Sequence, residues 1–423
     1  MSRFTICRDP LLSEEVWLAQ SAQGLAVRIV PTQRFREVVA VVAVGYGSTD
    51  LGFTADDASA HDSPEGVAHY LEHKLFEDEE LKVFDRFARR GAQVNATTGF
   101  TRTSYFFSAT HSYAENLADL LRLVSKPHIT AENVDKERGI IAQEIKMYED
   151  SPDYRAFFDL LRCLYREHPV RHPVGGTVES IQAISPAELL RCYGAFYRTG
   201  NAALAIAGPV DADAILAQVD ACALPAGAAP LSRCPADLGP PVQAHAARRM
   251  QVARSRLMLG CKDPDLAADP QARLRRQLVT RLLLEGLFAP SAPLRADLAE
   301  RGIVDDSLSY SYMAERSFGF VVIGGESEAP ELLESELRAA LFAPLAMTDD
   351  DLERMRRRVI GQYVRSFESA RGMAFAHVEQ ALEGIEPFGL LARLQAVRLD
   401  DLRARQRELF GAERLAAAVV AAG

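Results

Sequence analysis

Residues 65–78, EGVAHYLEHKLFED, place two histidines four positions apart, with a glutamate directly before the second one. The pair Ser63-Pro64 lies just upstream and predicts a helix start, with the serine as N-cap and the proline at the first helical position, where its missing N–H costs nothing. At 100° per residue, His69, Glu72 and His73 fall on one stripe of this helix, separate from its apolar residues. The segment therefore predicts an amphipathic helix whose polar stripe carries two imidazoles and a carboxylate.

Two interpretations of this stripe are open. Side chains at positions i and i+4 are neighbours on a helix, so both imidazoles can reach one cation at the Zn–N distance of about 2.0–2.1 Å, while Glu72 projects from the same side as a base. Alternatively, the stripe is an exposed polar face with two unremarkable histidines. A catalytic zinc takes three protein ligands and keeps one open position, so the metal interpretation requires a third donor elsewhere.

A second amphipathic helix is predicted over residues 134–150, VDKERGIIAQEIKMYED. Glu137 and Glu144 lie two turns apart on one of its faces, and valine and isoleucine residues form the opposite, core-facing side. The two carboxylates are candidates for the missing donor. Ordinary solvated glutamates would give the same pattern.

Composition restricts the other possibilities. The chain has 423 residues, of which 48% are hydrophobic and 25% charged, which is typical of a soluble globular protein with two or three domains. The net charge of -10 argues against nucleic-acid binding, which needs clustered cations. The six cysteines never come closer than twelve residues apart, so a metal would depend on histidine and carboxylate. No apolar run is long enough for a membrane span and no secretory signal is visible, so we expect a cytoplasmic protein without membrane contacts.

The order of predicted elements recurs along the chain. Apolar runs at 24–31 and 36–44 have the pattern of paired strands, and helices, two further strands, more helices and a last strand follow. Residues 224–241 are rich in Pro, Gly and Ala, lack periodicity and predict a linker. A similar order follows over 242–423. We therefore predict an α+β domain at 1–223, a linker at 224–241, and a diverged copy of the first domain at 242–423.

Several segments resemble a known family. The motif H-x-x-E-H, followed some seventy residues later by E-R-x(5)-E, resembles the inverzincin metallopeptidases, that is, the pitrilysin and insulin-degrading-enzyme family, and most closely its short bacterial branch related to mitochondrial processing peptidase. The segments that match in order are GVAHYLEHKLFE, GAQVNATTGFTRTSYFF, ERGIIAQEIKMYEDSP, HPVRHPVGGTVESI and YRTGNAALAIAGPVD. They cover most of residues 25–215, whereas the second half matches more weakly.

The resemblance implies a role for each polar residue of the two helices. His69, His73 and Glu144 would be the ligands of one zinc ion per chain, and Glu72 the general base. Glu137 would orient a ligating imidazole through a hydrogen bond without contacting the metal itself. This set of residues also suits metal-assisted hydrolysis, because a carboxylate beside the metal can take a proton from water and pass it to the leaving amine.

The resemblance also implies a fold and a way of binding substrate. Each domain would be a mostly antiparallel sheet packed by helices on one side. Asn95 and Ala96 would lie on a strand edge beside the zinc, where an extended peptide pairs with the backbone. A hairpin strand without a ligand is the simpler alternative for these two residues.

The chain departs from the family pattern in its second half. Members with a complete site carry an Arg and a Tyr that stabilise the oxyanion, but here Ala299 stands at the Arg position and Asp305 or Asp306 at the Tyr position. The resemblance therefore implies a zinc endopeptidase for small unstructured peptides, closed around a chamber. It would be a heterodimer with a homologous inactive subunit that supplies Arg and Tyr, and a homodimer is the less favoured assembly. The alternative is a non-catalytic scaffold or assembly subunit of the same fold.

Overall fold

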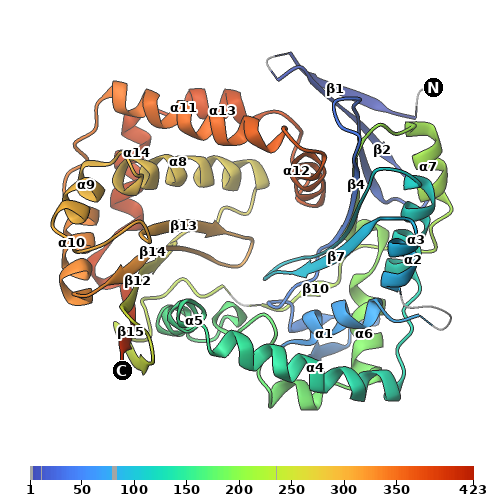
Figure 1. Cartoon of the computed structure of the whole chain (residues 1–423), viewed down its shortest axis with the longest axis horizontal. Coiled ribbons are helices and arrows are strands. Elements are labelled where there is room, and N and C mark those ends of the chain that lie inside the picture. Colours follow the sequence, from blue (N-terminus) through green and yellow to red (C-terminus); the bar gives the residue numbers. More distant parts are fainter. Residues whose placement is uncertain (1–2, 11, 79–82, 235) are drawn as a thin grey trace. The chain divides into compact units, whose positions relative to one another are not determined.

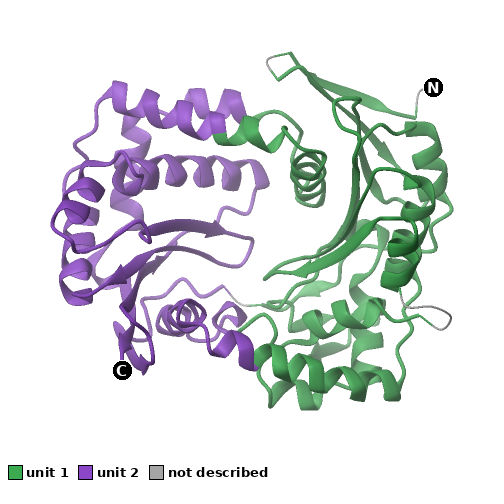
Figure 2. Cartoon of the chain, in the orientation of Figure 1, with its two compact units in different colours: residues 1–145, 173–234, 362–389 green, residues 146–172, 235–361, 390–423 purple. Residues whose placement is uncertain are grey.

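The computed structural model describes residues 3–10, 12–78, 83–234 and 236–423. It divides into two compact units, shown in green and purple in Figure 2. Unit 1 comprises residues 1–145, 173–234 and 362–389, and unit 2 comprises residues 146–172, 235–361 and 390–423. Neither unit is a single stretch of sequence, so both differ from the domain ranges 1–223 and 242–423 that the sequence predicts.

Unit 1 is built on a seven-stranded sheet with the strand order β1-β2-β3-β9-β4-β8-β7 (Figure 1). Only β3 and β9 run parallel; the other neighbours are antiparallel. The strands are β1 (Thr5–Asp9), β2 (Glu14–Gln20), β3 (Ala26–Pro31), β4 (Val38–Val44), β7 (Gln93–Thr98), β8 (Thr103–Ala109) and β9 (Ala202–Gly208). A separate small sheet has the order β10-β5-β6, with β5 (Gly52–Thr54), β6 (Ala60–Asp62) and β10 (Leu231–Ser232).

The composition of β4 explains why both faces of this sheet are covered. All seven of its residues are buried. Val38, Ala40, Val42 and Val44 belong to one hydrophobic core, while Val39, Val41 and Ala43 belong to another on the opposite face. Since successive side chains of a strand point to opposite faces, a continuous apolar strand requires packing on both.

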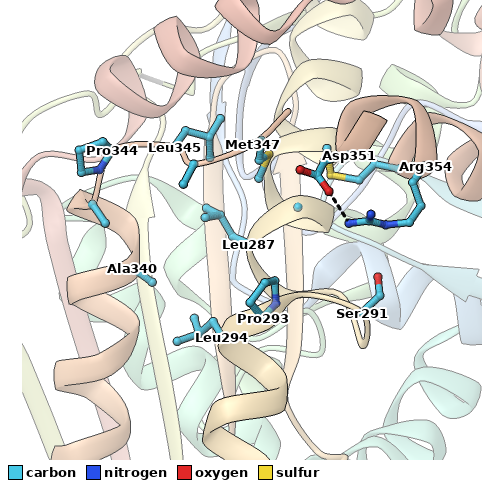
Figure 3. A pocket seen from close by; sticks show the side chains of 14 residues that line it. Leu287, Ser291, Pro293, Leu294, Ala340, Pro344, Leu345, Met347, Asp351 and Arg354 are labelled. Carbon is cyan, nitrogen blue, oxygen red and sulfur yellow. Dashed lines mark ion pairs between the residues drawn. The ribbon is translucent and has the colours of Figure 1, made fainter. Parts of the chain in front are cut away.

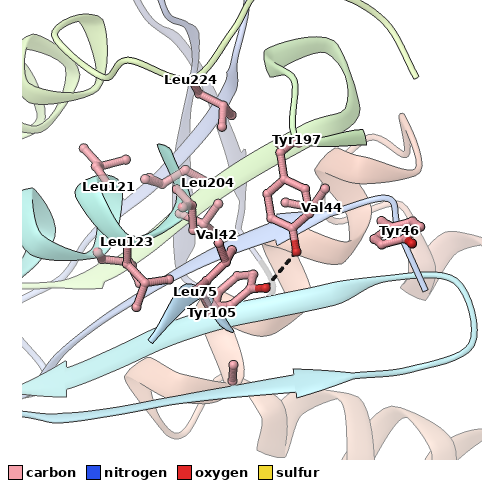
Figure 4. Close-up of a cluster of buried hydrophobic side chains, with 14 of the residues drawn as sticks. Val42, Val44, Tyr46, Leu75, Tyr105, Leu121, Leu123, Tyr197, Leu204 and Leu224 are labelled. Atoms are coloured by element: carbon pink, nitrogen blue, oxygen red, sulfur yellow. Dashed lines mark hydrogen bonds between the residues drawn. The ribbon is translucent and has the colours of Figure 1, made fainter. Parts of the chain in front are cut away.

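Helices of the first half cover one face of the sheet. They are α1 (Val67–Leu75), α2 (Val83–Arg89), α3 (Tyr113–Ser125), α4 (Ala131–Glu149), α6 (Pro186–Phe196) and α7 (Ala212–Asp220), with short 3-10 turns at Ser180–Ala183 and Thr199–Asn201. Figure 4 shows part of the core on this face, where the hydroxyls of Tyr105 and Tyr197 share a hydrogen bond of 2.7 Å. This pairing satisfies two phenol groups that would otherwise be buried without a partner.

Unit 2 repeats the topology with a five-stranded sheet of order β11-β15-β12-β14-β13. Its strands are β11 (His245–Met250), β12 (Ser255–Lys262), β13 (Ser309–Ala314), β14 (Gly319–Ser327) and β15 (Leu415–Ala422). The strand order β3-β9-β4-β8-β7 of unit 1 matches the strand order of this five-stranded sheet. The parallel pair of β11 and β15 corresponds to the parallel pair of β3 and β9. The predicted α+β class with two homologous, mostly antiparallel sheets is confirmed.

The expected pairing of the runs at 24–31 and 36–44 with each other is wrong. In unit 1, β9 lies between β3 and β4 and forms hydrogen bonds with both; in unit 2, β15 lies between β11 and β12 in the same way. The last strand of each half is strongly apolar and fits only a position covered on both faces. It therefore takes a central position in the sheet.

Each unit also contains a helix from the other half of the sequence. The remaining helices are α5 (Pro152–Leu164), α8 (Pro270–Phe288), α9 (Pro293–Glu300), α10 (Pro330–Phe342), α11 (Asp349–Ser366), α12 (Ala370–Leu382), α13 (Leu390–Ala396) and α14 (Leu399–Leu409), with 3-10 turns at Pro169–Arg171 and Ala412–Arg414. In unit 1, α12 packs against β3, β4 and β9, and in unit 2, α5 packs against β11, β12 and β15. In each unit, helices of the same half of the sequence thus cover one face of the sheet, and one helix from the other half covers the opposite face.

The predicted linker, 224–241, is divided between the units. Leu231 and Ser232 form β10, which pairs with β5 of unit 1. Asp237 belongs to unit 2, where it accepts a hydrogen bond of 2.7 Å from the buried ammonium of Lys262. None of the helices formed by the described residues is both long and apolar enough to cross a membrane.

Candidate metal centre

Helix α1 begins three residues later than the sequence predicts. Gly66, not Ser63, is the N-cap, with a left-handed φ of 88°, and the Ser63 hydroxyl instead donates a hydrogen bond of 2.6 Å to Glu188. A Cβ atom at Gly66 would lie 2.4 Å from the carbonyl oxygen of Gly175. Both the positive φ and this close approach require glycine, and they fix the start of the helix that carries the histidines.

Contacts between α1 and α4 hold the two predicted donor helices together. The Tyr70 hydroxyl donates to the Val134 carbonyl, and the Lys74 ammonium, which is fully buried, donates to the Asn133 carbonyl over 2.9 Å. Val134 and Ile141 are fully buried on the core side of α4, as predicted. The other side of α4 therefore faces the polar stripe of α1.

The three predicted ligands come together in unit 1. His69 Nε2 lies 3.7 Å from one carboxylate oxygen of Glu144, and His73 Nε2 lies 3.5 Å from the other. One donor atom from each residue lies within 4.8 Å of the other two. Two ligands at 2.0–2.1 Å from a tetrahedral centre are about 3.4 Å apart, so these separations are close to those that a zinc ion needs. Within the described part of the chain, no other group of three metal-ligating side chains converges in this way.

The two imidazoles have opposite electrostatic surroundings. Burial lowers the pKa of His69 to about 4, helped by the neighbouring His73, so His69 is neutral at pH 7 as a metal ligand must be. Burial would also lower the pKa of His73, but its hydrogen bonds with Glu137 and Glu144 outweigh that effect and raise the pKa to about 9. The carboxylates that stabilise a proton on His73 would stabilise a metal cation there equally well.

Glu137 is placed to orient the His73 ring. Its Oε1 lies 2.9 Å from His73 Nδ1, and this hydrogen bond lowers the pKa of the carboxyl group. Its other oxygen lies 3.6 Å from the Lys74 ammonium. Because Nδ1 is occupied by Glu137, Nε2 of His73 is left to face Glu144. Among the described residues, Nδ1 of His69 has no hydrogen-bond partner.

Glu72 lies on the same stripe and is mostly buried. Burial raises the pKa of its carboxyl group, and a hydrogen bond from Thr98 Oγ1, 2.6 Å from Glu72 Oε2, opposes this rise. A carboxylate with a raised pKa in a water-poor site is suited to accept and return a proton. Sequence reasoning missed Thr98, although it shares a face of β7 with Ala96 by simple alternation.

The predicted substrate residues lie on β7, which among the described strands pairs with β8 alone and so ends the seven-stranded sheet. Ala96 is buried on the side of the main core, whereas Asn95 is exposed, and its side-chain oxygen accepts a hydrogen bond of 2.8 Å from the Ala96 N–H. In the described part of the chain, the outer backbone edge of β7 is therefore unpaired, and the same strand carries Thr98, which contacts Glu72.

Charge supports a fit between these residues and a divalent cation. Three carboxylates, Glu72, Glu137 and Glu144, lie around the two imidazoles, and Lys74 is the ammonium that contacts this set. Lys74 was not predicted as part of the site, because its contact with Glu137 joins segments distant in the sequence; its other ion pair, with Glu77, is local. Since Glu77 shares Lys74, the set keeps a clear excess of negative charge when both imidazoles are neutral, which favours a divalent cation.

The positions predicted for the absent Arg and Tyr lie in unit 2. Ala299 belongs to α9, and Asp305 forms an ion pair with Arg254, with 2.7 Å between the guanidinium nitrogen and the carboxylate oxygen. Arg301, the nearest arginine, forms ion pairs with Asp297 and with Glu336. These contacts give the segment an ordinary structural role.

A pocket with a volume of about 460 Å³ is present in unit 2 (Figure 3). Figure 3 shows it lined mainly by apolar side chains such as Leu287, Leu294 and Met347, with the ion pair of Asp351 and Arg354 at one side. Its lining includes none of the predicted site residues. We therefore assign the chemistry to the cluster on α1 and α4.

Comparisons with known proteins agree with this geometry. The family model described as "Insulinase (Peptidase family M16)" matches residues 50–178, which include every predicted site residue. The model described as "Peptidase M16 inactive domain" matches residues 183–359.

Relatives match over nearly the whole chain. An uncharacterized zinc protease of Bacillus subtilis, YmfH, is 35% identical over 414 residues, covering 96% of each chain. The crystal structure of a putative M16-like peptidase from Alicyclobacillus acidocaldarius superimposes with a TM-score of 0.91 at 33% identity, covering 100% of this chain and 99% of the other. A chain of complex III2 from Candida albicans shares the fold alone, with a TM-score of 0.72 at 13% identity and 95% of each chain covered. By family model, sequence and structure, this chain belongs to the insulinase family of peptidases, M16.

Proposed function

We propose that this chain is a zinc-dependent endopeptidase that hydrolyses small unstructured peptides. The observation that carries the proposal is the convergence of His69, His73 and Glu144 on one point, with Glu72 beside them. The YmfH relative is called a zinc protease, and similarity over 96% of both chains supports the same class here. The H-x-x-E-H motif would make this chain an inverzincin of the short bacterial branch related to mitochondrial processing peptidase.

Each residue of the cluster has a distinct task. His69, His73 and Glu144 would hold one zinc ion per chain, which when bound supplies Lewis acidity at the scissile carbonyl and makes water a better nucleophile at neutral pH. Glu72 takes the proton from the attacking water and returns it to the leaving amine. Glu137 keeps His73 in the tautomer and orientation that leave Nε2 to face Glu144, and the hydrogen bond with His73, together with the charge of Lys74, lowers the pKa of Glu137.

The free edge of β7 would bind the substrate. A peptide that adds to this edge as a further strand presents its backbone along Asn95 and Ala96, close to Thr98 and Glu72. Only an extended segment can pair in this way, which excludes peptide bonds inside folded domains. A closed chamber around the site would add a second selection by size.

We propose further that the chain contributes the metal site of a heterodimer. The stabilisation of an oxyanion requires preorganised donors, and neither Ala299 nor Asp305 can donate to one. A homologous inactive subunit that carries the Arg and Tyr would complete the site, and a homodimer is less favoured for the same reason. A cytoplasmic location stays a prediction, which cell fractionation would test.

The experiment uses Glu72→Gln, which keeps the shape of the side chain and removes its basicity. We expect one zinc per chain in both proteins, and turnover of an unstructured fluorogenic peptide to fall at least 1,000-fold in the variant, assayed with the homologous partner subunit. Full turnover by the variant would refute the assignment of the base. Full turnover by the wild-type chain alone would refute the heterodimer.

The alternative, a scaffold subunit, predicts a different result for metal analysis. The likeness to a chain of complex III2 shows that this fold occurs in a multisubunit complex, but at 13% identity it gives no information about function. A scaffold has no reason to retain a buried, acid-rich cluster, which costs stability when no cation neutralises it. A metal-free protein with normal stability would favour the scaffold.

A further inference from the structure

Thr98, the last residue of β7, lies between the substrate edge and the proposed base. Along β7 the exposed residues alternate with buried ones, so Val94, Ala96 and Thr98 face the same side of the sheet as α1. The Thr98 hydroxyl donates to Glu72 over 2.6 Å, the short distance typical of a hydrogen bond to a charged acceptor. Within the described part of the chain, it is the hydrogen bond that the Glu72 side chain receives.

A second threonine supports Thr98 from behind. Thr103 is fully buried, and its hydroxyl lies 2.9 Å from the carbonyl oxygen of Tyr46 and 3.4 Å from Thr98 Oγ1. Thr103 is the donor in both contacts, with the Tyr46 carbonyl as the nearer acceptor. Thr98 Oγ1 only accepts from Thr103, so its own proton remains available for Glu72.

Glu72 needs such a restraint. A glutamate side chain loses rotamer entropy when it is fixed, and the like charge of Glu144 opposes its approach to the proposed metal ligands. The hydrogen bond from Thr98 occupies Oε2 and leaves Oε1 free. One oxygen thus anchors the side chain while the other can exchange a proton with water.

We propose that Thr98 is a positioning residue that holds Glu72 in the orientation needed for proton transfer and links this orientation to the strand that binds substrate. The inference rests on the proposed peptidase function. It adds that a substrate paired along β7 and the base that acts on it are held by the same strand. A displacement of β7 would move both together.

The first test compares Thr98→Val, which keeps the side-chain shape but removes the hydroxyl, with Thr98→Ser, which keeps the hydroxyl. With the partner subunit present, we expect Thr98→Val to lower kcat 10- to 100-fold with KM within twofold, and Thr98→Ser to retain most of kcat. Thr101→Val makes the same change in the turn of the same hairpin and should leave both constants unchanged. Equal kcat for Thr98→Val and wild type, or a loss in KM alone, would overturn the proposal.

The second test does not depend on activity. A double-mutant cycle with Thr98→Val and Glu72→Ala measures the thermal unfolding midpoint of the zinc-loaded chain. We expect Thr98→Val to lower the midpoint at least twice as much in the wild-type background as in the Glu72→Ala background. Equal shifts would mean that Thr98 supports only the strand, which contradicts the inference. If the wild-type complex cleaves no peptide, the proposed function fails, and the cycle still decides whether Thr98 holds Glu72.

Discussion

Each unit contains a cluster of charged side chains, and the two clusters differ in the groups that balance their carboxylates. In unit 2, Asp263 follows β12 and contacts helices α8 and α14, as the cluster of unit 1 lies on helices that follow β4. Asp263 and Glu408 are paired there with Arg276 and Arg405, and Tyr312 donates a further hydrogen bond to Asp263. Asp263 and Glu408 are thus matched by two guanidinium groups, and the more exposed Asp265 adds an ion pair of 3.2 Å to Arg276.

The cluster of unit 1 has no such balance. Three carboxylates lie around His69 and His73, and Lys74 is shared between Glu137 and Glu77. Hydrogen bonds with the carboxylates raise the pKa of His73 to about 9, so they stabilise a positive charge on its ring. The comparison teaches that the residues around a buried carboxylate decide what neutralises it. In unit 2 arginines do so permanently, whereas in unit 1 the carboxylates face imidazoles, which carry a positive charge only when protonated and otherwise leave room for a cation.

The largest effect is expected from breaking the cluster of unit 2. Arg405→Met leaves Asp263 buried with one guanidinium fewer, so the free energy of unfolding should fall by roughly 3–5 kcal/mol. Zinc affinity should not change, because Arg405 contacts no proposed ligand. Urea denaturation and zinc titration measure the two quantities.

Arg403→Met is the matched control on the same helix. Arg403 pairs with Asp400 on the surface, and loss of this pair should cost less than about 1 kcal/mol. A similar cost for Arg403→Met and Arg405→Met would contradict the view that the unit 2 cluster is a buried, mutually neutralised set.

A smaller effect is expected from Glu137→Gln in unit 1. The amide no longer holds His73 Nδ1 as a charged acceptor, so zinc affinity should fall about 10- to 100-fold. Competition with a chromophoric chelator measures the change. Glu132→Gln on the exposed first turn of the same helix should leave the affinity unchanged, and an unchanged affinity for Glu137→Gln as well would remove Glu137 from the site.

The smallest effect concerns pH. Burial would raise the pKa of Asp263, but hydrogen bonds from Arg276 and Arg405 outweigh it and lower the pKa to about 2. A depressed carboxyl pKa gives stability above the ordinary value near 4, and this stability is lost as the pH falls toward 2. Between pH 5 and pH 2.5, the free energy of unfolding of the wild type should therefore fall by roughly 1.5 kcal/mol more than that of Asp263→Asn. A constant difference across this range would show that Asp263 does not titrate with these arginines.

Local pattern was sufficient to predict much of the fold. Strands such as β4 and helices such as α4 follow from period and composition, which act between residues close in sequence. The position of β9 between β3 and β4 could not be predicted, because strand pairing depends on contacts between distant segments. The exchange of α5 and α12 between the units has the same cause.

The candidate site was predicted through its motif, and its supporting residues were not. His69, Glu72, His73 and Glu144 converge as the motif requires. The helix start moved to Gly66 because a close contact with Gly175 overrides the capping signal of Ser63. The local ion pair of Lys74 with Glu77 gives no sign of its second contact, with Glu137 on another helix. Their roles in metal binding and catalysis stay predictions.

The most direct test is the metal content of the purified chain and of its Glu144→Ala variant, measured by mass spectrometry after dialysis against trace zinc. We predict about one zinc per wild-type chain and a variant that remains folded but retains almost none, because two imidazoles alone leave the tetrahedral site incomplete. A wild-type chain that binds no zinc, or a variant that keeps the full amount, would contradict the proposal of a metal centre on α1 and α4.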